Sequence, residues 1–177
     1  MPVIPYKSKD ILEPAELVAA IRTRRGGTLL NLDRMLLHSP PFATGWNNFL
    51  SAVRNSLDVP AKLRELAICV VAILNGAEYE FIQHSPEFLK AGGTADQLAA
   101  LQQIDHPDLN SSLFNPQEKA IIQLSVEMTR TVQVNETTMT AVKNVLQNEQ
   151  HLVELIGVIS AYNMVSRYLV ALGIEPE

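Results

Sequence analysis

The apolar residues of this sequence recur at helical spacing along nearly its whole length, and this feature constrains the fold most. Between turn signals they return at positions i, i+3 and i+4, as one face of an amphipathic helix requires. No run shows the strict alternation that is typical of a half-buried strand. Ahead of the helix stop at Gly26 and Gly27, for example, Leu17, Val18 and Ile21 form one stripe. The sequence therefore predicts an all-α protein.

Proline and capping residues mark where several of these helices begin. Thr94 stands three residues before Gln97, which is the spacing of a capping box. Asn115, Pro116 and Glu118 supply a cap, a first-turn proline and a first-turn acid in agreement. Both segments are therefore predicted to open helices.

An aromatic-rich helix is predicted after the proline pair Pro40-Pro41, over residues 42–57. Its spacing is more typical of a packed core than of a cofactor site. The residues expected to face inward are Phe42, Trp46, Phe49, Leu50 and Val53.

Length and charge narrow the classes of protein. The 177 residues suit one domain, spanning residues 1–177. A net charge of −5 without a basic cluster excludes a nucleic-acid partner, because phosphate binding needs Lys and Arg gathered on one surface. The first residues lack a signal peptide, and the apolar runs are judged too short to cross a membrane, so we expect a cytoplasmic protein with no membrane partner.

The apolar content is high for a chain of this class. Hydrophobic residues make up 47% of the sequence and charged residues only 19%. Apolar helix surface in excess of what one subunit can bury is usually covered by another subunit. We therefore expect a homo-oligomer.

Cysteine and histidine usage limits the chemistry. Cys69 is the only cysteine, so one chain can form no disulfide, dithiol pair or cysteine-rich metal site. The four histidines include no pair at metal-binding spacing, so no metal site is expected. Cys69 lies in an apolar helix, where packing is the expected role of a thiol.

Two predicted helices carry ionisable residues on otherwise apolar surfaces. Glu65 and Cys69 are four residues apart on the first helix, and Glu80 and His84 are four apart on the second. A carboxylate beside an imidazole favours the imidazolium while burial disfavours it, which suits proton transfer near neutral pH. Glu65 completes a three-member relay if the two helices pack antiparallel. The spacing alone is also common in ordinary helix contacts.

At these residues the sequence resembles a known family. Residues 64–92, RELAICVVAILNGAEYEFIQHSPEFLKAG, are similar to the central helical hairpin of the carboxymuconolactone decarboxylase family, within the alkylhydroperoxidase-D-like superfamily. The peroxidase branch carries a glutamate and then Cys-x-x-Cys-x-x-x-His. Glu65 and His84 match that glutamate and histidine, whereas Ala77 and Glu80 occupy the cysteine positions. The sequence around Tyr79, Glu80 and Phe81 instead resembles that of the decarboxylase branch, with Phe81 in place of tryptophan.

The resemblance implies a bundle of about seven to eight helices around that hairpin, and trimers or hexamers. It implies cofactor-free decarboxylation of a small carboxylated lactone, with His84 protonating carbon, Glu80 orienting His84, and Glu65 as second relay member. Two alternatives stay open: a peroxidase-like role using Cys69 or a partner's thiols, and a non-catalytic oligomer with a degenerate pocket. Arg64 is expected to point away from Glu65, towards a surface glutamate or a substrate carboxylate, with the glutamate favoured.

Overall fold

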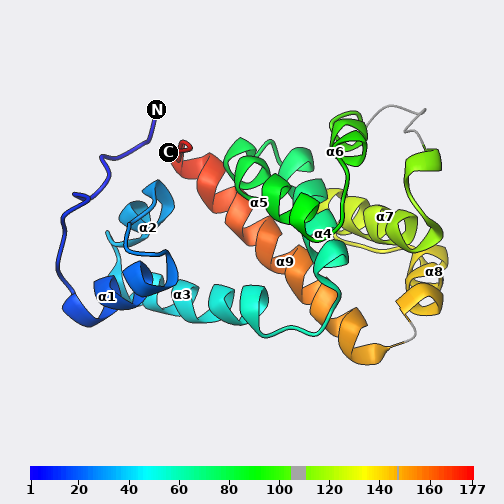
Figure 1. Cartoon of the computed structure of the whole chain (residues 1–177), viewed down its shortest axis with the longest axis horizontal. Coiled ribbons are helices and arrows are strands. Elements are labelled where there is room, and N and C mark those ends of the chain that lie inside the picture. Colours follow the sequence, from blue (N-terminus) through cyan, green and yellow to red (C-terminus); the bar gives the residue numbers. More distant parts are fainter. Residues whose placement is uncertain (105–110, 147) are drawn as a thin grey trace. The chain divides into compact units, whose positions relative to one another are not determined.

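The computed structural model describes residues 1–104, 111–146 and 148–177, and within these ranges the regular structure is entirely helical. The all-α prediction is confirmed. The nine α-helices of these ranges exceed the seven to eight expected, because two of them, Asn31–Leu36 and Ala95–Leu101, are short helices separated from their neighbours by turns. In chain order the elements are α1 (Ala15–Arg24), α2 (Asn31–Leu36), α3 (Pro40–Asn55), α4 (Ala61–Leu74), α5 (Glu78–Lys90), α6 (Ala95–Leu101), the 3₁₀ helix η1 (Ser111–Leu113), α7 (Pro116–Arg130), α8 (Glu136–Leu146) and α9 (Glu149–Leu172) (Figure 1).

The chain divides into two compact units. The first comprises Met1–Ser56 together with Tyr168–Glu177, and the second comprises Leu57–Arg167. All of the predicted site residues belong to the second unit. The single-domain organisation expected from the length stays a prediction.

Helix α4 is the central helix of the second unit. It packs against both α5 and α7. From Leu66 to Ala72 every side chain is at most 1% exposed. A helix that is apolar on all sides is stable only when covered on all sides, so α4 gives its one internal acid, Glu65, a largely dry environment.

The predicted caps of α6 and α7 are confirmed. The Thr94 side chain accepts a hydrogen bond from Gln97 N at 3.1 Å, and the Gln97 side chain accepts one from Thr94 N at 3.2 Å. Asn115 and Glu118 exchange the same pair of bonds at 2.9 Å each. Each box satisfies backbone N–H groups that have no partner within a helix, which fixes where the helix starts.

The first unit buries only part of the predicted aromatic stripe of α3. Trp46, Leu50 and Val53 are buried as expected. The inward placement of the two phenylalanines is wrong, since Phe42 is 46% and Phe49 is 47% exposed. Both lie at the flank of the buried stripe. Phe42 still contacts an aromatic neighbour, because its ring centroid lies 5.8 Å from that of Trp46.

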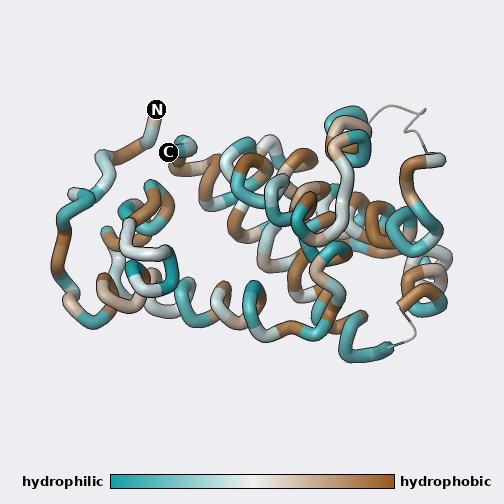
Figure 2. The backbone as a smooth tube through the Cα atoms, in the orientation of Figure 1, coloured by the Kyte–Doolittle hydropathy of each residue, from teal (hydrophilic) through white to brown (hydrophobic). Residues whose placement is uncertain are grey.

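Helix α9 corrects the expectation that every apolar run is too short to cross a membrane. Its 24 residues, with a mean hydropathy of 1.4 in the most apolar window, are long and apolar enough by composition. Half of that window is buried inside the protein, as in the core helix of a soluble fold. Figure 2 shows hydrophobic and hydrophilic residues alternating around the helices, which is the pattern of surfaces packed on one side. The length of α9 is therefore weak support for a membrane span.

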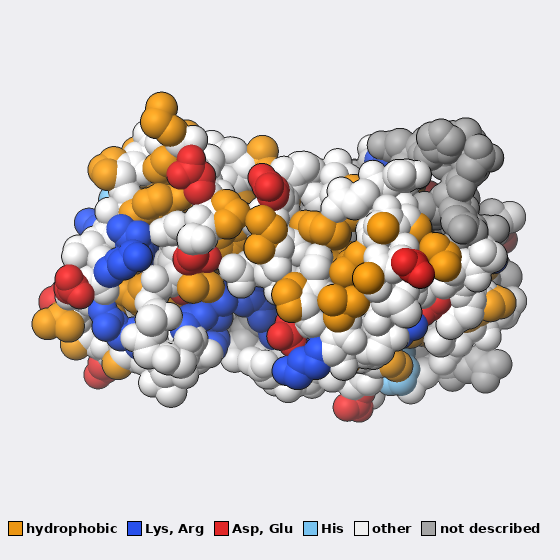
Figure 3. Space-filling model, turned by 45° about the horizontal axis from the view of Figure 1, so that its top comes forward, with side chains coloured by type: hydrophobic (Ala, Val, Ile, Leu, Met, Phe, Trp, Pro, Cys, Tyr) orange, Lys and Arg blue, Asp and Glu red, His pale blue; other side chains and the backbone are white. Residues whose placement is uncertain are grey.

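Apolar side chains also reach the surface. Figure 3 shows them gathered in patches on one face of the molecule. In the second unit, Ile82 and Leu89 of α5 are 45% and 42% exposed, and Val153 of α9 is 69% exposed. Such surface is compatible with the expected homo-oligomer, which stays a prediction.

A buried carboxylate, Glu127, joins the end of α7 to the start of α8. It accepts hydrogen bonds from Gln123 Nε2 at 2.8 Å, Thr138 Oγ1 at 2.7 Å and the backbone N of Asn135 at 2.8 Å. Burial alone would raise the pKa of Glu127, but these bonds outweigh it and lower the pKa to about 2. The ionised form is therefore the one the fold stabilises.

We expect Glu127→Gln to destabilise the protein at neutral pH by about 1–3 kcal/mol, because it removes hydrogen bonds to a charged acceptor. The folded pKa lies below the ordinary 4.5, so the contribution of this ionisation is full above about pH 4.5 and is lost as the pH falls through about 2. Urea unfolding at several pH values measures this, with the exposed Glu136→Gln of the α8 first turn as the matched control. An equal effect of both variants would contradict the assignment.

Candidate active site

The α4–α5 hairpin brings the three predicted site residues together. Helix α4 ends at Leu74, and Gly76 adopts a positive φ of 62°, a backbone conformation that glycine takes at little cost. The backbone N–H of Ala77 then bonds to Ala72 O at 2.8 Å, and α5 begins one residue later. So short a connection returns α5 along α4, and Glu65 and His84 lie opposite each other as a consequence.

His84 lies between two carboxylates. Its Nδ1 donates to Glu65 Oε2 at 2.7 Å, while its Nε2 lies 3.2 Å from Glu80 Oε2. The second contact is close in distance but poorly aligned, so that Glu80 oxygen is buried without a true hydrogen bond. The exposed fractions are 6% for Glu65, 1% for Glu80 and 7% for His84. The convergence expected from the sequence is therefore present, in a largely desolvated setting.

The electrostatics favour an ion pair. Burial alone would lower the pKa of His84, but the hydrogen bond to Glu65 and the nearby Glu80 outweigh it, so the pKa lies above its usual value. Burial alone would raise the pKa of Glu65, yet the bonds from His84 and Arg64 bring it below its usual value. The two shifts agree in direction, since each favours a charged His84 paired with a charged Glu65, and the Nδ1 proton is directed at Glu65.

Tyr162 of α9 is a site neighbour that the sequence reasoning missed. Its ring packs edge-to-face against His84, with centroids 4.9 Å apart, and its side chain is 0% exposed. Aromatic rings in this arrangement attract each other and restrict rotation. The helical stripe of α9 predicts that Tyr162 is buried, but no local pattern predicts which residue it meets.

Arg64 departs from its expected direction. It does not point away from Glu65, because its Nε donates to Glu65 Oε1 at 3.2 Å. Glu65 thus divides its two oxygens between Arg64 and His84. The contact forms because the long arginine side chain folds back over the adjacent residue, which helix geometry alone does not predict.

Cys69 is a packing residue in this structure, as predicted. It is 0% exposed. Burial and the neighbouring charges of Glu65 and Glu80 raise the pKa of its thiol to about 12. Since the thiolate is the reactive form, Cys69 is a poor nucleophile at neutral pH.

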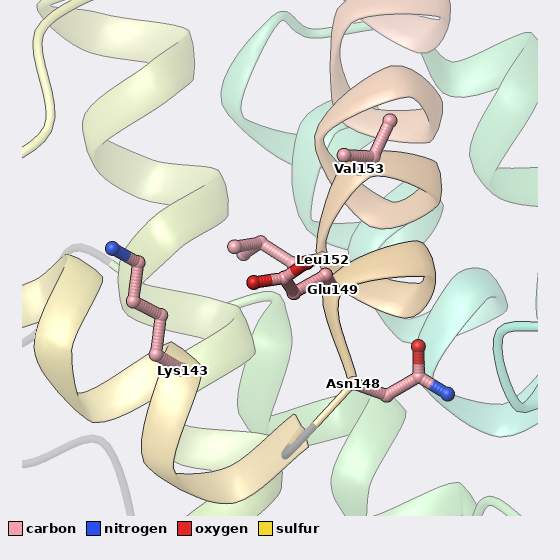
Figure 4. A pocket seen from close by; sticks show the side chains of 5 residues that line it. All are labelled: Lys143, Asn148, Glu149, Leu152 and Val153. Carbon is pink, nitrogen blue, oxygen red and sulfur yellow. The ribbon is translucent and has the colours of Figure 1, made fainter.

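The described part of the chain also has cavities away from these residues. One, of about 500 Å³, opens beside the start of α9 and is lined by Lys143, Asn148, Glu149, Leu152 and Val153 (Figure 4). Another, of about 480 Å³, lies against α4 and α5 and has Phe81 and Ile82 in its wall. Neither includes Glu65, Glu80 or His84 in its lining.

Solved structures resemble this fold over nearly the whole chain. An uncharacterised peroxidase-related protein from Silicibacter sp. TM1040 superposes with a TM-score of 0.79 at 13% identity, covering 99% of this chain and 92% of that one. The debrominase Bmp8, as a cysteine-to-alanine variant with 2,3,4-tribromopyrrole, gives 0.78 at 14% identity, covering 100% and 94%. An alkylhydroperoxidase AhpD core protein, peroxidase-related, from Ralstonia eutropha JMP134 gives 0.77 at 15% identity, covering 99% and 94%. At such identities the likeness establishes the fold.

The sequence comparisons agree with that fold. No curated protein matches the sequence. A sequence model of the carboxymuconolactone decarboxylase family matches residues 40–115, a segment that includes the whole α4–α5 hairpin with Glu65, Glu80 and His84. Through this segment the chain is similar to the carboxymuconolactone decarboxylase family.

Proposed function

We propose that this protein is an enzyme that decarboxylates a small carboxylated lactone, or a related acid, by proton transfer without a cofactor. The observation that carries the proposal is the buried imidazole ring of His84, which lies between the carboxylates of Glu65 and Glu80. A positioned general acid contributes about 100- to 10,000-fold to a proton-transfer step. The site therefore has the group that such a reaction needs most.

The two nitrogens of His84 are suited to different roles. Nδ1 is held at 2.7 Å by Glu65, which fixes the orientation of the ring. Nε2 faces Glu80 at 3.2 Å without good alignment, so its proton is the one that a substrate can take. Glu80 would then orient the donor, and Glu65 would stabilise its charged form.

In the proposed reaction, the bond between carbon and the departing carboxylate breaks and carbon dioxide leaves. The electron pair is delocalised into the conjugated lactone carbonyl, and His84 Nε2 delivers its proton to carbon. The neutral imidazole then takes a proton from water, and the site returns to its starting state. Low solvation supports this chemistry because it favours loss of charge from the carboxylate.

Thiol-based peroxide chemistry has less support. The cysteine positions of the peroxidase motif hold Ala77 and Glu80, and the one thiol, of Cys69, is buried with a raised pKa. Thiolate formation is the step that such chemistry requires. The peroxidase-related and debrominase functions are therefore attributed only to the similar proteins whose names state them, and neither is proposed for this protein.

The reaction is tested by incubating the protein in D₂O with unsaturated γ-lactones that bear a carboxylate. We expect carbon dioxide to be released and one deuterium to appear at the protonated carbon, both measured by mass spectrometry. The matched saturated lactone acids cannot delocalise the electron pair, so they should be unchanged. Absence of carbon dioxide from every unsaturated acid would leave the non-catalytic oligomer as the better description.

A further inference from the structure

Arg64 has binding capacity that its contacts inside the protein do not use. Its Nε donates to Glu65 Oε1, and its terminal nitrogens Nη1 and Nη2 donate to no group in residues 1–104, 111–146 and 148–177. The side chain is 17% exposed, so the guanidinium lies at the edge of the buried site. The other oxygen of Glu65, Oε2, accepts from His84 Nδ1, so Arg64 bonds to Glu65 through Nε alone. The terminal N–H groups of the Arg64 guanidinium are therefore available to a ligand.

A second, independent observation at the same site concerns Glu80. Its Oε2 is buried and lacks a hydrogen-bond partner, although it lies 3.2 Å from His84 Nε2. A buried carboxylate oxygen without a donor costs free energy, and a bound molecule can supply the donor. One continuous chain of contacts runs from Arg64 through Glu65 and His84 to Glu80. The terminal N–H groups of Arg64 and the unpartnered oxygen of Glu80 therefore lie at the two ends of one site.

We infer that Arg64 is the residue that selects anionic ligands at this site, by holding a carboxylate that stays on the substrate through the reaction. This inference rests on the proposed function for the substrate, and it adds the group that recognises the charge. The planar guanidinium donates two parallel N–H groups to a carboxylate, a match that lysine cannot make. Because its Nε stays on Glu65, the same side chain links the bound anion to the carboxylate that holds His84.

The test compares two ligands that the protein cannot turn over and whose acid group is not the departing one: γ-butyrolactone-γ-acetate, in which the carboxylate is on a side chain, and its uncharged acetamide. Isothermal titration calorimetry should show that the wild type binds the acid about 10- to 100-fold more tightly than the amide, which is the range for hydrogen bonds to charged groups. In Arg64→Met the ratio should fall to about one. In Arg64→Lys, which keeps the charge beside Glu65, it should fall several-fold.

Arg130→Met is the matched control, because Arg130 is an exposed arginine at the end of α7. The residue before it, Thr129, accepts a hydrogen bond from Asn163, and Asn163 accepts one from Asn75. Asn75 lies just beyond the C-terminal end of α4, whereas Arg64 lies near its N-terminal end, so the control is far from the site. The control should keep the wild-type ratio. Wild-type protein that does not distinguish acid from amide, or an Arg64→Met ratio equal to wild type, would overturn the inference.

Two further readouts separate this inference from the reaction. If Arg64→Met fails to fold by circular dichroism, the Arg64→Lys ratio decides, and an unchanged ratio there overturns the anchor. Since both ligands are unreactive, charge discrimination that depends on Arg64 in a protein that releases no carbon dioxide would overturn the reaction and leave the anchor. Turnover in a protein whose charge discrimination does not depend on Arg64 would overturn the anchor and leave the reaction.

Discussion

Replacing His84 with glutamine is expected to reduce decarboxylation about 100- to 10,000-fold, the usual contribution of a positioned general acid. Glutamine retains a polar group between Glu65 and Glu80, but it has no proton to give near neutral pH. Single-turnover measurement of carbon dioxide release tests this, with circular dichroism as the check on folding. Glu87→Gln, an exposed carboxylate on the same helix, is the control and should retain wild-type turnover.

The pH dependence of wild-type turnover distinguishes an acid role of His84 from a packing role. His84 must be protonated to act, so wild-type turnover should decline only as the pH rises above 6.5 and through the raised pKa of His84. A folded His84→Gln protein with wild-type turnover, or wild-type turnover that has already been lost with rising pH before pH 6.5 is reached, would remove His84 from the mechanism.

Stability should follow the same ionisations with a definite sign. The pKa of His84 is raised on folding, so its contribution is full below about pH 6.5 and is lost as the pH rises through the folded value. The pKa of Glu65 is lowered, so its contribution is full above pH 4.5 and is lost as the pH falls through the folded value. The pair therefore stabilises the fold most between these two limits.

Local patterns predicted the helices and one contact of the site. The caps at Thr94 and Asn115 depend on residues three positions apart, so sequence spacing alone specifies them. The contact between Glu80 and His84 is an i,i+4 contact and is predictable for the same reason. The shorter contact of His84 with Glu65 required the added assumption that the two helices run antiparallel, which the short turn after α4 fulfils.

Other features depend on which surfaces meet in space. The α3 pattern includes both Trp46 and Phe49 in one apolar face, yet Trp46 is 5% exposed and Phe49 is 47% exposed, because periodicity does not give the width of the covered stripe. Tyr162 reaches His84 from a helix far along the chain. The direction of Arg64 depends on rotamers that burial selects. These are tertiary outcomes with no local signal.

Substitution of a core residue in α7, a helix that packs against the site, is expected to have a large effect on the free energy of unfolding. Leu124 of α7 is 0% exposed, and α7 packs against α4, the helix that carries Glu65. Leu124→Ala should lower the free energy of unfolding by about 2–5 kcal/mol, because it removes buried apolar contacts and leaves a cavity that neighbouring helices fill only in part. Urea unfolding measures it, and Val153→Ala, at a position 69% exposed, should change stability by less than about 0.5 kcal/mol.

The activity of that variant shows whether packing and chemistry are separate in this fold. Leu124 is in the hydrophobic core and is not among the hydrogen-bonded or aromatic partners of His84, so folded Leu124→Ala should keep turnover within a few-fold of wild type. A loss in stability of under about 1 kcal/mol would mean that α7 packs loosely on α4. A large loss of turnover in a variant that remains folded would mean instead that α7 positions Glu65, and that the site extends beyond the α4–α5 hairpin.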